Sequence, residues 1–166
     1  YGLRPKVHVN QFSVLGGVAA AIAKGAVSVD HLEEIDEKDL AALSKSNCVA
    51  TLLPGCSHFL SMPYGAANRL IEANAIVALA SDFNPGSSPS FDLMHVLSLA
   101  CIKMKMTPQA AINALTINAA AAIEINETHG KIALGRKSPI ILTKEMPSLA
   151  YLAYAYTENH IQRIFI

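Results

Sequence analysis

A continuous run of apolar residues at 75–80 ends abruptly in Ser81 and Asp82 and is followed by Asn-Pro-Gly at 84–86. Strands that are apolar on both faces are typical of parallel sheets covered by helices. The run therefore predicts a buried parallel strand with Asp82 at its carboxyl end, where the loops of α/β folds collect functional groups. A second interpretation is that this aspartate only helps to form the turn.

Three earlier segments repeat this order, so the chain contains four units of a strand followed by a helix, each about 25 to 30 residues long. We expect strands at 6–11, 26–31, 48–54 and 75–82. We expect helices at about 16–24, 37–46, 63–74, 91–106 and 108–123. This α/β pattern predicts half of a (β/α)8 TIM-type barrel, with about four βα units. An open flavodoxin-like sheet fits less well, because the chain has no glycine-rich phosphate-binding motif.

The end of the chain follows a different pattern. Segments 130–135, 139–143 and 161–166 are predicted strands without helices of the barrel type between them, and the apolar segment 146–156 could be a helix or a packed loop. We therefore divide the chain into barrel units at 1–128 and part of a small accessory β-sheet at 129–166.

The composition is unusually apolar, with 52% hydrophobic and 16% charged residues. No apolar run approaches the ~20 residues of a membrane helix, so we expect no membrane partner and much surface that is buried or covered by another part of the protein. Thirteen basic residues balance thirteen acidic ones, which argues against a nucleic-acid partner. The three cysteines are an odd number in apolar surroundings, which favours reduced thiols and a cytoplasmic location.

Three of the four predicted strands end in residues that bind metals or transfer protons, namely His8, His31 and Asp82. In a (β/α)8 barrel the carboxyl ends of all strands converge on one face. A single histidine at a strand end is more often structural than catalytic. Three such residues at corresponding ends favour a metal site.

Several segments together resemble the imidazolonepropionases, enzymes of histidine breakdown in the amidohydrolase superfamily. The matching segments are Val-His-Val-Asn-Gln at 7–11, Ser-Val-Asp-His-Leu-Glu at 28–33, Leu-Pro-Gly at 53–55, Ala-Leu-Ala-Ser-Asp-Phe-Asn-Pro-Gly at 78–86 and Leu-Thr-Ile-Asn-Ala-Ala at 115–120. The Asp-x-Asn-Pro-Gly loop and the Asp-His-Leu strand end carry most of the specificity. The resemblance covers almost the entire chain and implies the C-terminal half of the barrel.

The resemblance implies one divalent metal, zinc or iron, with His8 and Asp82 as ligands and His31 as the catalytic acid and base beside it. It places substrate contacts at Gln11, Asn84, Gly86 and Ser87. The family often has glutamate where this chain has Gln11, and an amide cannot carry a proton, so only hydrogen bonding to the substrate ring is expected there. Ser138-Pro139 stands where these enzymes usually have Ala-Asp, a departure in the β-sheet tail.

The family's His-x-His pair on the first barrel strand and its contacts to the substrate propionate belong to an N-terminal half that this chain lacks. We therefore expect a C-terminal fragment that is itself inactive, with the missing half as its partner and a homodimer as the alternative. The intact enzyme is expected to hydrolyse a small molecule, 4-imidazolone-5-propanoate, to N-formimidoyl-L-glutamate. Two alternatives remain open: another amidohydrolase, acting on a cyclic amide or as a deaminase, and a non-catalytic half-barrel for binding or assembly, since two ligands do not complete a four-coordinate site.

Overall fold

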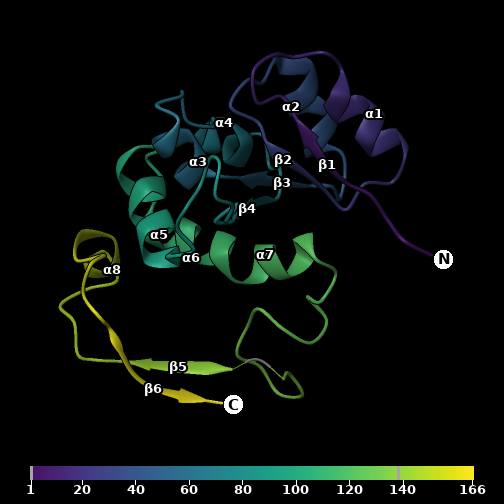
Figure 1. Cartoon of the computed structure of the whole chain (residues 1–166). Helices are drawn as coiled ribbons and strands as arrows, with labels where there is room; N and C mark the ends of the chain where they lie inside the picture. The colour runs from purple at the N-terminus through teal and green to yellow at the C-terminus, as the bar shows by residue number, and fades with distance from the viewer. Residues whose placement is uncertain (1, 138) are drawn as a thin grey trace.

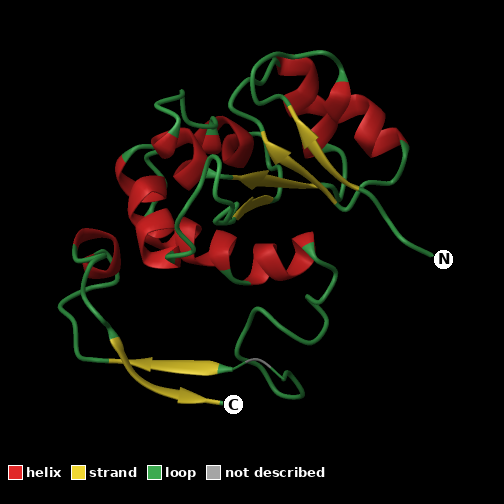
Figure 2. Cartoon of the chain, viewed as in Figure 1, coloured by secondary structure: helices red, strands yellow, loops and turns green. Residues whose placement is uncertain are grey.

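Four parallel strands form the central sheet of the computed structural model, in the order β1-β2-β3-β4 (Figures 1 and 2). The strands are β1 (Lys6–Val9), β2 (Ser28–His31), β3 (Val49–Leu52) and β4 (Val77–Leu79). The sequential order and parallel direction confirm the predicted half-barrel of four βα units. The structure describes residues 2–137 and 139–166, so Ser138, where the β-sheet tail departs from the family pattern, lies outside the described residues.

Helices connect the strands and follow the last of them (Figure 2). They are α1 (Gly17–Ala23), α2 (Glu37–Ser44), α3 (Pro54–Phe59), α4 (Ala67–Glu72), α5 (Leu93–Ile102), α6 (Pro108–Leu115) and α7 (Ile117–Ala122). Local capping explains several of their ends. Asp36 accepts a hydrogen bond from the backbone N–H of Asp39 at the start of α2, and Thr107 accepts one from Ala110 at the start of α6. No helix within the two described ranges combines the length and apolarity that crossing a membrane requires.

Several predicted boundaries were wrong. The segment after β3, expected to be a loop, forms α3 with Pro54 in its first turn, a position that does not need the missing N–H. The following helix, α4, begins at Ala67 and not at Pro63. The long helix expected from Pro108 is broken into α6 and α7 at Thr116, whose backbone is not helical (φ −118°, ψ −89°). The Thr116 hydroxyl donates to the carbonyl of Ile112, a bond that competes with the regular helix.

The end of the chain forms an antiparallel pair, β5 (Ile140–Thr143) and β6 (Ile161–Phe165), with the short helix α8 (Tyr151–Tyr154) between the two strands. The predicted strand at 130–135 was wrong. Its bounding residues, Gly130 and Gly135, have positive φ, 92° and 79°, so the chain turns at both ends of the segment. Ile132 and Leu134 between them are exposed. In Figure 1 the β5–β6 pair lies beyond α7, away from the parallel sheet.

The two faces of the parallel sheet have different surroundings. One face packs against α1, α2 and α4 in the main hydrophobic core, whose fully buried members include Val18, Val29, Leu43, Leu52 and Leu70. On the other face the strand register aligns His8 with Asp30, Asp30 with Thr51 and Thr51 with Ala78. The first three strands therefore place a polar row, His8, Asp30 and Thr51, on the face that would line the inside of a barrel.

A buried hydrogen bond ties the end of β1 to the first turn of α2. The side-chain amide of Asn10 donates to a carboxylate oxygen of Asp39 at 2.6 Å, and both residues are buried. Asn10 itself has positive φ (57°), which lets the chain turn directly after the strand. Burial raises the pKa of Asp39 above its usual 3.8, and the hydrogen bond from Asn10 opposes that shift. The hydrogen bond from Asn10 therefore favours the ionised form of a carboxylate that burial disfavours.

We predict that Asn10→Gly lowers the free energy of unfolding by about 1–3 kcal/mol, because it leaves the Asp39 carboxylate buried without its donor. Glycine accepts the positive φ, so the substitution adds no backbone strain at this position. Removing the amide raises the pKa of Asp39 further, and a raised folded-state pKa costs stability as the pH rises through it, so the loss should be larger at pH 7 than at pH 4.

Urea unfolding followed by circular dichroism measures this difference. Asn74→Gly is the matched control, because Asn74 also has positive φ (63°) but is exposed. Equal losses for the two variants at both pH values would contradict the prediction.

Candidate active site

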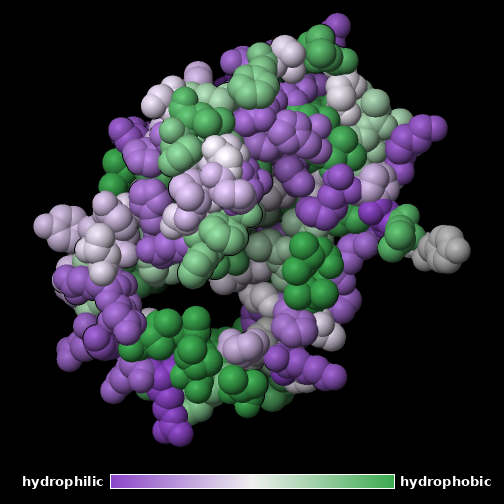
Figure 3. Space-filling view, viewed as in Figure 1, coloured by the Kyte–Doolittle hydropathy of each residue, from purple (hydrophilic) through white to green (hydrophobic). Residues whose placement is uncertain are grey.

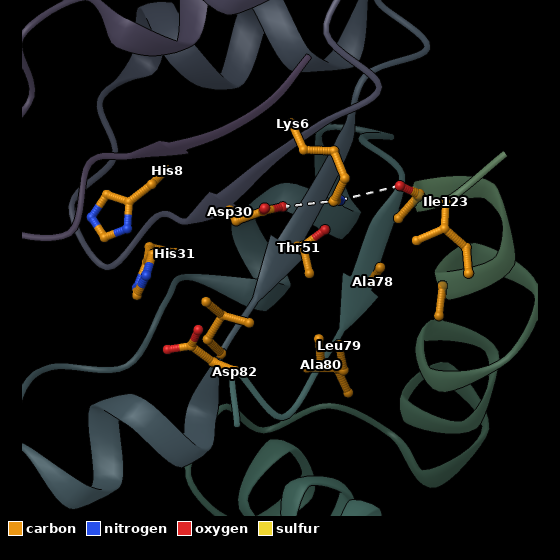
Figure 4. A pocket seen from close by; sticks show the side chains of 13 residues that line it. Lys6, His8, Asp30, His31, Thr51, Ala78, Leu79, Ala80, Asp82 and Ile123 are labelled. Atoms are coloured by element: carbon orange, nitrogen blue, oxygen red, sulfur yellow. Dashed lines mark hydrogen bonds and ion pairs between the residues drawn. The ribbon is translucent and has the colours of Figure 1, made fainter. Parts of the chain in front are cut away.

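A cavity of about 400 Å³ lies against the polar face of the parallel sheet (Figure 4). Its lining includes His8 from β1, His31 from β2 and Asp82 from the segment that follows β4. These are the three residues that the sequence placed at corresponding strand ends, and Figure 4 shows their side chains on the same side of the strands. The lining does not include Gln11, Asn84, Gly86 or Ser87.

His31 reaches the cavity because the backbone departs from regular strand geometry. Strict alternation would place His31 on the face opposite to Asp30, its neighbour in β2. His31 and Leu32 both have positive φ, 92° and 63°, a conformation that costs free energy in residues other than glycine. The turn brings the His31 ring beside that of His8, with 4.1 Å between ring centroids and a tilt of 54°.

A buried acid lies behind His31. The Glu33 carboxylate has an oxygen 3.5 Å from Nδ1 of His31, and the side chains are 1% and 5% exposed. Its other oxygen accepts a hydrogen bond of 2.9 Å from the hydroxyl of Ser57 in α3. Glu33 closes the sequence motif at 28–33 but was not predicted to have a role; a carboxylate two residues after a candidate catalytic histidine was the available signal.

The loop after Asp82 is organised by one side chain. The Asn84 side-chain oxygen accepts hydrogen bonds from the backbone N–H groups of Gly86 (2.9 Å) and Ser87 (2.8 Å), and its amide donates to the carbonyl of Asp82 at 2.7 Å. Asp82, three residues after the end of β4, has positive φ (52°), so the chain turns there. Because its amide is engaged within the loop, Asn84 shapes the loop in which Gly86 is exposed and Ser87 half-buried.

The buried thiol of Cys56 connects Gln11 to this loop. The Gln11 side-chain amide donates to Sγ of Cys56 at 3.6 Å, and Cys56 is fully buried at the start of α3. Burial raises the pKa of the Cys56 thiol, and the Ser87 side chain partly offsets that effect. Cys56 is therefore a neutral contact that links Gln11 to the loop of Ser87.

Two further charged residues, Lys6 and Asp30, lie at the other end of the cavity. Neither was predicted from the sequence to belong to the site. The Lys6 ammonium is 3.6 Å from a carboxylate oxygen of Asp30 and 3.1 Å from the carbonyl of Ala122 at the end of α7 (Figure 4). Lys6 precedes His8 by two residues in β1, so the two side chains share one face of the sheet, which was the signal available in the sequence. The lysine thus joins the sheet to the last turn of α7, where the helix dipole favours a cation.

The donors at the cavity fit a divalent metal in kind but not in number. Imidazole nitrogen and carboxylate oxygen are ligands of both zinc and iron. Within residues 2–137 and 139–166, however, no three histidine, cysteine or acidic side chains cluster closely enough to hold an ion. His8 and Asp82 would therefore supply part of a coordination shell, and other ligands must complete it. Their assignment as ligands stays a prediction.

Sequence comparison identifies relatives along the whole chain. The amidohydrolase family model matches residues 7–163. An imidazolonepropionase from Christiangramia forsetii is 49% identical over 166 residues, which are 100% of this chain and 40% of that protein. An imidazolonepropionase from Thermoanaerobacter pseudethanolicus is 42% identical over 164 residues, 99% of this chain and 39% of that protein. The chain thus spans about 40% of the length of the curated relatives it matches.

Solved structures show the same fold. An adenosine deaminase from Xanthomonas campestris with bound zinc matches with a TM-score of 0.79 at 17% identity, over 90% of this chain and 41% of that one. An ochratoxinase from A. niger matches with a TM-score of 0.73 at 19% identity, over 96% of this chain and 39% of that one. With the family model covering nearly all of its residues, this chain belongs to the amidohydrolase family.

Proposed function

We propose that the chain is the C-terminal part of an imidazolonepropionase, which hydrolyses 4-imidazolone-5-propanoate to N-formimidoyl-L-glutamate in histidine breakdown. The observation that carries the proposal is 49% identity to a protein of that name over all 166 residues. The grouping of His8, His31 and Asp82 at one cavity supports a hydrolytic site. Because the chain spans about 40% of such relatives, the activity is proposed for the longer protein and not for this chain alone.

In this proposal His8 and Asp82 hold one divalent metal, zinc or iron, together with ligands from outside the chain. When bound, the metal supplies a nucleophile from water near neutral pH and polarises the carbonyl under attack. Two solved relatives of the same fold contain zinc, which supports a divalent metal without selecting between zinc and iron. The Asn84 amide donates to the backbone carbonyl of Asp82, which follows β4, and this bond holds Asp82 near the carboxyl end of the strand.

His31 is proposed to move protons. An imidazole can both accept and donate a proton, so one ring can take a proton and later give it to the leaving ring nitrogen. Its ring lies 4.1 Å from that of His8, centroid to centroid, which puts the proton carrier next to a proposed metal ligand. The ring is nearly buried, which limits its motion and keeps it aimed into the cavity.

The polar loops are proposed to hold the substrate ring. Gln11, fixed through Cys56, would offer a neutral amide to the imidazolone, and the loop of Asn84, Gly86 and Ser87 would surround the ring from the side of Asp82. A glutamine cannot exchange protons with the substrate. In this protein the proton transfers would therefore depend on His31.

We predict that the longer protein opens the ring of 4-imidazolone-5-propanoate and releases N-formimidoyl-L-glutamate, measured by chromatography of the product. Adenosine, guanine and a cyclic imide are the comparison substrates, since they represent the alternative deaminase and cyclic-amide activities. Turnover of one of these in place of the imidazolone would contradict the proposed substrate. Binding without turnover of any of them would favour the non-catalytic alternative.

In the same protein, His31→Ala should lower turnover by ~10² or more, the usual contribution of a general acid and base. Metal content, measured by elemental analysis, should stay nearly unchanged, because His31 is proposed to move protons and not to bind metal. His129→Ala is the control, since His129 lies outside the cavity lining. Loss of metal together with activity would instead make His31 a ligand.

The partner proposed for this chain is the N-terminal half of the barrel, with a homodimer as the alternative. Strand β1 has one sheet neighbour within the described residues, and its Lys6 and His8 are exposed. The β5–β6 pair exposes apolar side chains, including Ile141, Leu142 and Ile164. Figure 3 shows hydrophobic residues gathered at the β5–β6 pair and a gap between the pair and the body of the molecule. Apolar surface of this kind usually marks a contact with another chain segment.

We predict that the separate chain self-associates, binds zinc or iron weakly, and gains both tight metal binding and hydrolysis when mixed with the N-terminal half. The physical reason is that His8 and Asp82 alone leave most of the coordination shell to water. Light scattering, elemental analysis after dialysis and the product assay measure the three effects. A monomer that unfolds cooperatively and gains nothing on mixing would contradict the half-barrel partner.

A further inference from the structure

We propose that Glu33 is a positioning residue for His31: its buried carboxylate accepts a hydrogen bond from Nδ1–H, fixes the ring tautomer and leaves Nε2 free to handle protons. The proposal rests on the proposed function in so far as His31 is the proton carrier. It assigns a role to a residue that neither the metal site nor the substrate loops use.

The two facing atoms of the pair have no other hydrogen-bond partner among the described residues. Nδ1 of His31 and Oε2 of Glu33 are both buried and make no hydrogen bond within the described residues, yet they lie 3.5 Å apart. His31 is the one basic side chain within 4.0 Å of this carboxylate in the described ranges. A buried carboxylate oxygen and a buried ring nitrogen are each costly without a partner. A small approach of the two atoms satisfies both groups at once, provided that Nδ1 carries the hydrogen.

The carboxylate is itself held in place. The Ser57 hydroxyl, buried in α3, donates to Oε1 of Glu33 at 2.9 Å, which leaves Oε2 directed toward His31. The neighbouring Cys56 thiol has a raised pKa because it is buried, so it does not add a second negative charge beside the acid. Glu33 therefore has one fixed oxygen and one oxygen that is available to His31.

The backbone shows why the pair forms. His31 and Leu32 both have left-handed φ, 92° and 63°, and Leu32 is fully buried. This turn directs the Glu33 side chain back beneath the ring that precedes it by two residues. Backbone strain at successive residues persists only where the surroundings compensate for it, and here it sets the geometry between an acid and a histidine.

Fixing the tautomer has a chemical consequence. With hydrogen on Nδ1, the lone pair is on Nε2, which makes no hydrogen bond in the described part of the chain and is not sealed from solvent. Nε2 can then accept a proton, and the buried carboxylate stabilises the imidazolium that results. Without Glu33 the other tautomer, with hydrogen on Nε2, competes and cannot act as a base at that atom.

The competing interpretation is that Glu33 only anchors α3 through Ser57. The test uses the longer protein that carries this chain, loaded with zinc, and compares Glu33→Gln, Ser57→Ala and Glu34→Gln. Glu34 is the matched control, because it is the adjacent glutamate and is exposed. We expect Glu33→Gln to lower kcat by ~10²-fold with KM nearly unchanged, while Glu34→Gln keeps wild-type values. Ser57→Ala keeps the carboxylate and should lower kcat less than Glu33→Gln does.

The second measurement does not depend on activity. Nitrogen-15 NMR of labelled histidines, with His31 assigned by its loss in His31→Ala, reports which ring nitrogen carries hydrogen. We expect the Nδ1–H form in the wild type and a shift toward Nε2–H in Glu33→Gln. A wild-type His31 in the Nε2–H form overturns the proposal, even if the glutamine variant does not fold. An unchanged kcat in a folded Glu33→Gln also overturns it. If the wild type shows the Nδ1–H form but no ring opening, the positioning holds and the proposed function fails.

Discussion

The parallel register of the four strands is the constraint on which the candidate site depends. Hydrogen bonding between neighbours aligns His8 with Asp30, Asp30 with Thr51 and Thr51 with Ala78, so side chains far apart in the sequence share one face. Parallel direction also brings every carboxyl end to the same edge. The cavity lies against that face, with His8, His31 and Asp82 at one end and Lys6 and Asp30 at the other.

The candidate site lies where the backbone stops being regular. Asn10, His31, Leu32 and Asp82 all have positive φ, and each lies at or just beyond the end of a strand. Such conformations cost free energy, and nearby bonds offset the cost: Asn10 to Asp39 after β1, and Asn84 to the Asp82 carbonyl after β4. The strands supply a rigid frame, and these short turns aim the side chains.

The chain also shows what a part of a barrel lacks. The helix-covered face of its sheet has a continuous apolar core, which explains how four βα units can hold together. The other face has a polar row and an open cavity, and the donors there do not complete a metal site within the described residues. A covered face and an open face are consistent with a chain that belongs to the amidohydrolase family and spans about 40% of the length of its relatives.

The sequence by itself determined the order of the four parallel strands, the half-barrel and the positions of His8, His31 and Asp82 at or near strand ends, because apolar runs and capping residues act locally. It did not determine α3, the break at Thr116 or the turns at 130–135, where backbone geometry depends on neighbours distant in the chain. Only the tertiary structure revealed Glu33 behind His31, Cys56 beneath Gln11 and Lys6 against α7. These contacts join separate elements, and left-handed residues redirect side chains in ways that strand alternation does not predict.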